Sequence, residues 1–171
     1  APMRPARVII RAGRRAAAAP LAGRRNDPLV ARYQNWVLPY PRQRAADLVA
    51  QIVAAGEPTN DQWWMAAVCD RESGETLGDL ALRLSWGGRS AEVGYTLASR
   101  NWGRGYATEA LQALLAWLFA ERGITRACGT TTLLAQGGTE AACWAPPPPP
   151  PPTPPQTPPP RRPPTSPSPP P

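Results

Sequence analysis

The sequence predicts an α/β domain of the α+β type, with a mixed, mostly antiparallel sheet flanked by helices. Two helical patterns precede three extended segments, and a long helical pattern and a further extended segment follow them. This order places the long helix as a crossover between two neighbouring parallel strands. A proline-rich tail lies beyond this domain.

The tail limits how much of the chain can fold. Residues 146–171 are almost entirely Pro, Thr, Ser, Gln and Arg, so they lack both backbone donors and apolar side chains. Such a segment is expected to stay extended, solvated and disordered. We therefore divide the chain of 171 residues into a poorly defined N-terminal segment with one short strand (1–25), a folded core (26–132), an irregular segment (133–145) and a disordered tail (146–171).

The first part of the chain has one predicted strand and two predicted helices. The strand covers Arg7 to Arg11, and prolines and glycines interrupt the Ala-rich stretch after it. Asp27 is a predicted N-cap, with Pro28 at the first position of a short helix. The apolar spacing predicts the second helix over Asp47–Ala55.

The middle of the chain predicts most of the sheet. Three strands joined by turns are expected over Gln62–Asp70, Thr76–Trp86 and Ala91–Ala98, as an antiparallel meander. Helical spacing then returns over Gly105–Arg122, and Ile124–Thr132 is a further predicted strand.

The charge and the hydropathy of the chain indicate which partners and which cellular location to expect. The formal net charge is +7, and every basic residue is an arginine. Positive charge suits nucleic acid, a membrane surface or a phosphate-rich cofactor, but the arginines are scattered rather than arranged in a stripe, which disfavours nucleic acid. No apolar run approaches the roughly 18 residues that a membrane span requires, and no signal peptide is evident. We expect a cytoplasmic protein with no nucleic-acid or membrane partner.

The cysteines do not indicate a metal site. Cys69, Cys128 and Cys143 are widely spaced, and the chain has no histidine. Neither a zinc site nor a disulfide framework is supported by this spacing. We expect no metal, and we expect Cys69 and Cys128 to be small, buried apolar residues on strands.

The segment most informative about function is AEVGYTLASRNWGRGYATEAL, residues 91–111, in which a strand leads into a Gly- and Arg-rich loop that opens onto a helix. The first amides of a helix lack intrahelical partners and lie at the positive end of its dipole, so they can bind a diphosphate. Gly103 and Gly105 allow close backbone approach, and Arg100 and Arg104 add positive charge. The same pattern also fits a tight turn with two solvated arginines.

Three stretches of the chain resemble one enzyme family. The run RNWGRGYATEA, residues 100–110, resembles motif A of the GNAT acetyltransferases, whose pattern is Q/R-x-x-G-x-G/A. NDPLVARYQNW (26–36) and AEVGYTL (91–97) are similar to the first helical region and the fourth strand of the branch that acetylates protein N-termini, including those of ribosomal proteins, and small amines. The resemblance covers residues 26 to about 128. It implies an enzyme that transfers acetyl from its cosubstrate, acetyl-CoA, to a primary amine.

The resemblance also implies two sets of cofactor-binding residues. The pyrophosphate loop, which acts mainly through backbone amides with Arg100 nearby, matches Trp102, Gly103, Arg104, Gly105, Tyr106 and Ala107. The family's fourth strand lies beside the pantetheine arm and splays from the fifth strand, and it matches Val93, Gly94, Tyr95 and Thr96.

Glu92 is the candidate catalytic residue. It matches the strand-four glutamate that acts as general base in the histone-acetylating branch of the superfamily. Direct attack of an amine on the thioester requires removal of a proton, and without histidine the base must be a carboxylate, a tyrosine or a water chain. The alternative is a solvent-facing strand glutamate paired with an arginine. Glu109 is expected to support the helix N-terminus electrostatically.

After Thr132 the resemblance ends, because the family's next strand, Asn-containing loop, helix and final hairpin have no counterpart here. We therefore expect a fold that is incomplete at the C-terminus, with an exposed sheet edge. A change of reading frame near residue 130 and a genuine tail that binds a polyproline-recognising domain, such as SH3 or WW, are both open. Two alternatives to the active transferase are a catalytically impaired remnant and an interaction protein that acts through its tail.

Overall fold

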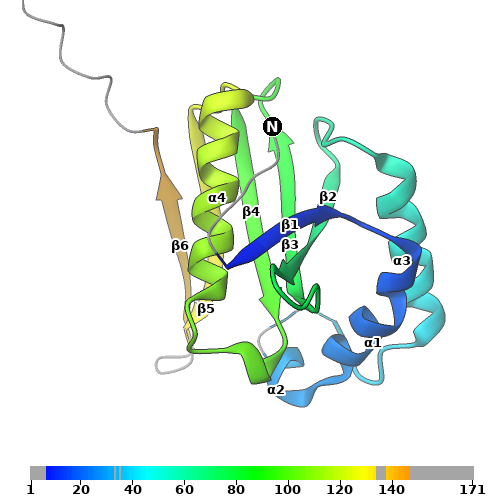
Figure 1. Cartoon of the computed structure of the whole chain (residues 1–171). Helices are drawn as coiled ribbons and strands as arrows, with labels where there is room; N and C mark the ends of the chain where they lie inside the picture. Colours follow the sequence, from blue (N-terminus) through cyan, green and yellow to red (C-terminus); the bar gives the residue numbers. More distant parts are fainter. Residues whose placement is uncertain (1–6, 33, 35, 134–137, 147–171) are drawn as a thin grey trace, which may run out of the picture.

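The computed structural model describes residues 7–32, 34, 36–133 and 138–146 (Figure 1). The expectations for the tail, including a polyproline-recognising partner, fall on residues 147–171 and lie outside this part of the chain.

The strands form one mixed sheet in chain order. All neighbouring strands are antiparallel except β4 and β5, which run parallel and are joined by the crossover helix α4 (Tyr106–Glu121). The predicted mixed, mostly antiparallel sheet is thus confirmed. Its strands are β1 (Val8–Ala12), β2 (Trp63–Asp70), β3 (Thr76–Ser85), β4 (Ser90–Leu97), β5 (Arg126–Leu133) and β6 (Gly138–Trp144).

The helices cover both faces of the sheet. Leu80 and Leu82 of β3 are buried in one cluster with Leu114 of α4, whereas Asp79, the residue directly before Leu80, pairs with Arg24 of α1. Because successive strand residues point to opposite faces, α4 and α1 lie on opposite sides of the sheet. The remaining elements are α1 (Ala18–Asn26), α2 (Pro28–Ala31), α3 (Arg42–Ala55) and the 3-10 turns η1 (Arg15–Ala17) and η2 (Ser99–Asn101).

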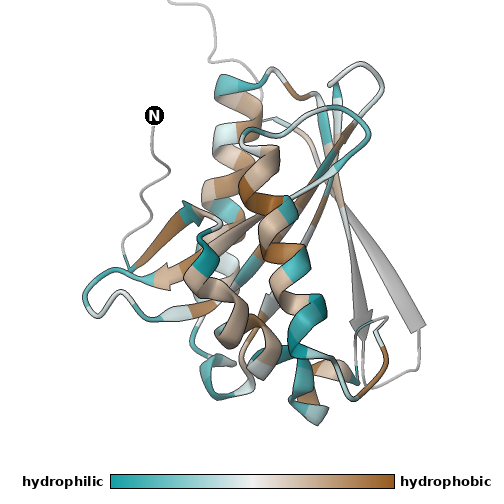
Figure 2. Cartoon of the chain, turned by 90° about the vertical axis from the view of Figure 1, so that its right-hand side faces the viewer, coloured by the Kyte–Doolittle hydropathy of each residue, from teal (hydrophilic) through white to brown (hydrophobic). Residues whose placement is uncertain are grey.

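Two cores hold these layers together, and both apolar and polar residues lie along the helices (Figure 2). The larger core lies between α4 and the sheet. Its largest fully buried side chains are Val8, Val68, Leu80, Leu82, Leu114 and Leu118. The smaller one lies where α1 and α3 meet, around Leu21, Tyr40 and Val49.

The N-terminal half is more regular than the sequence predicts. The Ala-rich stretch forms α1, because Pro20 falls in the first helical turn, where no intrahelical donor is lost, and Leu21 is buried against Tyr40. Helix α3 begins at Arg42 rather than Asp47, directly after Pro41. The extra turn buries Ala45 in the smaller core.

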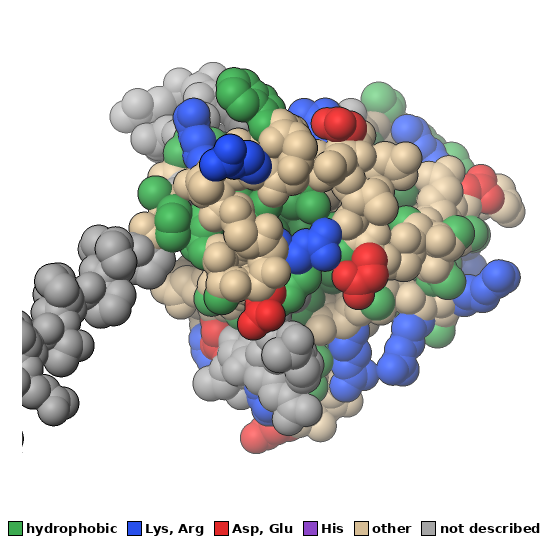
Figure 3. Space-filling view, turned by 90° about the horizontal axis from the view of Figure 1, so that it is seen from above, with side chains coloured by type: hydrophobic (Ala, Val, Ile, Leu, Met, Phe, Trp, Pro, Cys, Tyr) green, Lys and Arg blue, Asp and Glu red, His purple; other side chains and the backbone are tan. Residues whose placement is uncertain are grey.

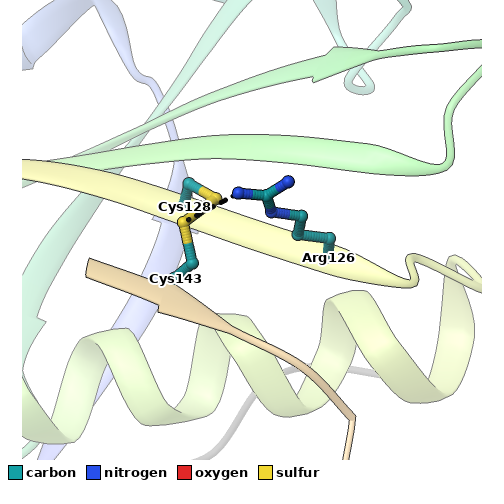
Figure 4. Close-up of a disulfide and its surroundings, with 3 residues drawn as sticks. All are labelled: Arg126, Cys128 and Cys143. Atoms are coloured by element: carbon teal, nitrogen blue, oxygen red, sulfur yellow. Dashed lines mark hydrogen bonds between the residues drawn. A yellow bond between two sulfur atoms is a disulfide. The ribbon is translucent and has the colours of Figure 1, made fainter. Parts of the chain in front are cut away.

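The C-terminal side of the sheet corrects two predictions. The sequence predicts an irregular segment over residues 133–145, but residues 138–144 form β6, which pairs antiparallel with β5. The strand register makes Cys128 and Cys143 direct partners, and a disulfide joins them (Figure 4). Arg126 Nη2 donates to Cys143 Sγ at 3.5 Å. Cys128 is therefore not a free apolar residue. Its partner could not be predicted because register, rather than sequence spacing, brings the two together. Cys69 is free and buried, as expected.

Charges are interspersed rather than segregated. On the face seen in Figure 3, arginine and acidic side chains are scattered among apolar and uncharged groups. None of the described helices is both long and apolar enough to cross a membrane. Within the same residues there is no group of three or more His, Cys, Asp or Glu side chains that could hold a metal ion.

Candidate active site

The loop between β4 and α4 has the backbone conformation of a helix-capping turn. Gly103 has φ +72° and Gly105, the N-cap residue of α4, has φ +78°. Side chains other than hydrogen are disfavoured in this left-handed region. A Cβ on Gly103 would meet nothing within 4 Å. A Cβ on Gly105 would lie 3.3 Å from Arg7 Nη2, which is a tight contact. The turn therefore requires both glycines for their backbone conformation, and at Gly105 the Arg7 side chain leaves little space as well.

The main-chain donors of this loop are exposed and unused. Upstream, Asn101 N and Trp102 N bond to the carbonyls of Ala98 and Ser99, and the first bond of the helix runs from Glu109 N to Gly105 O at 3.0 Å. Between them, the N–H groups of residues 103–108 have no acceptor among the described residues. Residues 102–105 are exposed to solvent. The start of α4 thus offers several N–H groups, at the positive end of its dipole, to an anion.

Arg7, the residue directly before β1, holds this loop in place. Its Nη1 donates to Arg104 O at 3.1 Å, and its Nε donates to Glu109 Oε2 at 2.9 Å. Its guanidinium carbon also lies 4.9 Å from the ring centroid of Tyr106. Sequence reasoning missed Arg7, because nothing local marks a contact with residues about a hundred positions away.

Glu109 is the acceptor of most of these bonds. Arg7 donates to it from both its main chain and its side chain. Burial works to raise the pKa of the Glu109 carboxyl, but the Arg7 backbone and side-chain hydrogen bonds outweigh it and hold the pKa below its ordinary value. A negative charge is thereby fixed in the first turn of α4, where the helix dipole favours it.

The predicted loop side chains face different neighbours. Arg100 pairs with Glu75 in the turn before β3 at 2.5 Å, whereas Arg104 is exposed. Trp102 donates from its indole to Leu97 O at 3.0 Å, at the end of β4. Tyr106 and Ala107 are half-buried and pack against the larger core. Main-chain groups are therefore the larger part of what this loop offers to a ligand.

The two parallel strands part close to this loop. Pairing runs from Ser90 with Arg126 to Val93 with Gly129 and then stops, although β4 continues to Leu97 and β5 to Leu133. Beyond Val93 the edge of β4 that faced β5 is no longer paired with it. This is the opening that the resemblance implies.

The four predicted residues of β4 divide between the two faces of the sheet. Val93 is buried in the core against α4, and the alternation places Tyr95, which is half-exposed, on the same side. Gly94 and Thr96 are on the opposite side. A Cβ on Gly94 would meet only Ala81 Cβ, at an ordinary 3.9 Å. The packing of the protein therefore leaves space above Gly94.

Glu92 lies on the same side as Gly94. Its Oε2 accepts a hydrogen bond from Arg83 Nη2 at 2.7 Å, and the side chains are 42% and 45% exposed. These contacts are those of a solvent-facing glutamate paired with an arginine, and they also leave the carboxylate accessible. The role of Glu92 as general base stays a prediction.

Two further contacts, which the sequence did not reveal, support this side of the sheet. Arg24 Nη2 lies 2.9 Å from Asp79 Oδ2 in a buried pair that joins α1 to β3. Asp27 caps α2 through Leu29 N at 2.9 Å, as predicted, and also accepts from Ser99 Oγ at 2.5 Å, just before the loop. The Ser99 hydroxyl, with smaller help from main-chain donors, holds the pKa of the Asp27 carboxyl below its ordinary value despite some desolvation.

A mixed sheet whose parallel strands part beside an exposed, donor-rich helix start defines the class as acetyl-CoA-dependent acyltransferases. The profile described as acetyltransferase (GNAT) domain matches residues 7–133, so the chain belongs to the GNAT family. The match begins at β1 and thus includes more of the N-terminal segment than the predicted core.

Solved structures show the same fold. A GNAT-family acetyltransferase from Bacillus anthracis superimposes with a TM-score of 0.64 at 20% identity, covering 75% of this chain and 72% of that one. The acetyltransferase from Salmonella typhimurium that modifies the N-terminal serine of ribosomal protein L7/L12 gives 0.62 at 17% identity, over 79% and 76%. RimL, the ribosomal L7/L12 alpha-N-protein acetyltransferase, in complex with coenzyme A gives 0.63 at 17%, over 77% and 74%. No curated protein sequence matches the chain.

Proposed function

We propose that this protein is a cytoplasmic N-acetyltransferase that transfers the acetyl group of acetyl-CoA to a primary amine, either a protein N-terminal α-amine or a small-molecule amine. The observation that carries the proposal is the set of N–H groups at residues 103–108, which have no acceptor among the described residues and of which those at 103–105 belong to exposed residues. They lie at the start of α4, on the loop that leaves β4 after it parts from β5. Together they offer a site for the diphosphate of the cosubstrate and an opening beside it for the rest of that molecule.

The residues present fit the cosubstrate. The diphosphate would accept hydrogen bonds from the amides around Gly103 and Gly105, with Arg104 adding positive charge. The pantetheine arm would run along β4 from Val93 to Thr96, where the space above Gly94 allows close passage. Acetyl-CoA supplies the acetyl group as a thioester.

In this proposal the protein's own residues remove a proton from the acceptor amine. The amine nitrogen forms a bond to the acetyl carbon, the carbon–sulfur bond breaks, and the thiolate of coenzyme A leaves and takes up a proton. In this proposal Glu92, on the open side of β4, accepts the proton that the amine loses, directly or through water. Its exposure is compatible with access by an acceptor.

A protein N-terminus is the first acceptor to test. Two of the similar structures are described as acetyltransferases of ribosomal protein L7/L12. These proteins share the fold of this chain, and fold does not identify the acceptor. An experiment must therefore distinguish a protein N-terminus from a small amine.

Two measurements test the proposal. A ligand that binds only the folded state stabilises it by about 2.7 kcal/mol at one hundred times its Kd, so acetyl-CoA is expected to raise the melting temperature. Release of coenzyme A thiol is then followed with N-terminal peptides and small amines. Binding without release in any amine would favour the impaired remnant. No binding would contradict the proposal and favour action through the tail.

A further inference from the structure

Three side chains form a row across the sheet on the side of Gly94. The strand register makes Trp63 of β2 the partner of Arg83 on β3, and Arg83 the partner of Glu92 on β4. Their neighbours Trp64, Leu82 and Val93 are buried in the core against α4, so the alternation places the row on the opposite face. Trp63 is 51% exposed, similar to the other two. The row is therefore accessible to a molecule that lies on this face.

Arg83 is held at two points. Its Nη2 donates to Glu92 Oε2 at 2.7 Å, and its guanidinium carbon lies 5.3 Å from the centroid of the Trp63 ring. The planar guanidinium can stack and donate at the same time, which a lysine ammonium cannot do with the same geometry. Oε1 of Glu92, in contrast, accepts no hydrogen bond from the described residues.

We propose that Arg83 is a positioning residue for the transfer reaction. Braced on Trp63, it fixes Oε2 of Glu92 and leaves Oε1 directed to the acceptor amine. An exposed ion pair contributes little to stability, so the consequence of this pair is the orientation of the carboxylate. The inference rests on the proposed function, since it assigns Arg83 a part in the same reaction.

The chain contains a matched control for the test. Arg122, at the end of α4, also pairs with a glutamate, Glu57, at 3.7 Å, and its guanidinium carbon lies 5.5 Å from the Trp117 ring centroid. Arg83→Met and Arg122→Met thus each remove an ion pair and a ring contact, and Arg122→Met also removes the hydrogen bond that Arg122 Nη2 donates to Pro58 O at 2.9 Å. Misplacement of a reacting group by about 1 Å can cost on the order of a hundredfold in rate. We expect Arg83→Met to lower kcat at least tenfold, by this reasoning, and Arg122→Met to leave kcat unchanged.

Further readouts separate positioning from a general effect on the fold. Arg83→Met is expected to change neither the KM for acetyl-CoA nor the rise in Tm that acetyl-CoA causes, compared with the unmodified protein. Arg83→Lys keeps the charge but not the stack, so it should recover part of the lost kcat. In a Glu92→Gln background, Arg83→Met should cause no further loss, because its effect passes through Glu92.

The outcomes distinguish this inference from the proposed function. If the unmodified protein transfers acetyl while Arg83→Met equals Arg122→Met in kcat, the positioning role is wrong and the transferase assignment stands. A further loss from Arg83→Met in the Glu92→Gln background would also overturn the role. If the unmodified protein binds acetyl-CoA but acetylates no amine, both the role and the proposed transfer fail.

Discussion

Gly78 and Gly94 are both strand glycines on neighbouring strands, yet their surroundings differ. A Cβ on Gly78 would overlap the main-chain oxygen of Thr96 and come within 2.9 Å of Leu97 Cα. A Cβ on Gly94 would meet only Ala81 Cβ, at 3.9 Å. The fold thus requires glycine at position 78 but not at position 94, where any requirement comes from a ligand.

Gly94→Ala is therefore expected to leave the free energy of unfolding unchanged or slightly raised, since alanine in a strand is favoured over glycine by roughly 0.5–1 kcal/mol. The added methyl group would narrow the space along β4 and raise the KM for acetyl-CoA several-fold. Urea unfolding and steady-state kinetics measure the two effects, with Gly78→Ala as the destabilised control. An unchanged KM would show that no ligand passes over Gly94.

Glu92 gives the second prediction for a single residue. Loss of a general base typically costs 10²–10⁴-fold in rate. Glu92→Gln keeps the size of the side chain but cannot accept the proton, so kcat should fall in this range while acetyl-CoA still raises the melting temperature. Turnover and a pH–rate profile equal to those of the unmodified protein would place the base elsewhere.

At the scale of helices and strands, the contact between the start of β1 and α4 holds the loop that joins β4 to α4. Arg7 bonds to the loop through Arg104 O and to the first turn of α4 through Glu109. The pKa of Glu109 lies below its ordinary value in the folded protein. A carboxyl with a lowered folded pKa contributes stability above its unfolded-state pKa and loses it as the pH falls through the folded one.

Glu109→Gln is thus expected to reduce the free energy of unfolding at neutral pH by about 1 kcal/mol, the size of one net hydrogen bond to a partly exposed charge. The difference between the variant and the unmodified protein should shrink as the pH is lowered past the folded pKa of Glu109. Urea unfolding at a series of pH values measures it. A difference that stays constant into the acid range would contradict the assigned cause.

At the scale of the whole molecule, the buried pair of Arg24 and Asp79 connects the helices around α1 to the sheet. Both side chains are nearly inaccessible, and Nε and Nη1 of Arg24 have no acceptor within the described part of the chain. Removing one member leaves an uncompensated buried charge, which typically costs 3–5 kcal/mol. Replacing both by apolar groups of similar size is often neutral.

Asp79→Ala should accordingly lower the free energy of unfolding by about 3–5 kcal/mol, measured by urea unfolding. The double variant Arg24→Met with Asp79→Leu should recover most of that loss. If Asp79→Ala cost no more than a surface substitution, the pair would not be holding the two layers together.

The sequence by itself determined β1, the order of the elements from α2 to β5, and the identity of the loop. These depend on local physics: apolar spacing distinguishes helix from strand, Asp27 caps its helix through its own neighbours, and Gly103 and Gly105 mark a turn that few other residues adopt. Helix boundaries were less predictable, because the start of α3 depends on burial of Ala45 in the smaller core. The local sequence pattern does not indicate such packing.

Only the tertiary structure decided which distant residues meet. Arg7 with Glu109, Arg24 with Asp79, and Cys128 with Cys143 are brought together by strand register and by the packing of layers. The row of Trp63, Arg83 and Glu92 is likewise a product of register, since a slip of one residue would turn each side chain to the other face. Contacts of this kind have no signature in the sequence around each residue, because they arise when the whole sheet forms.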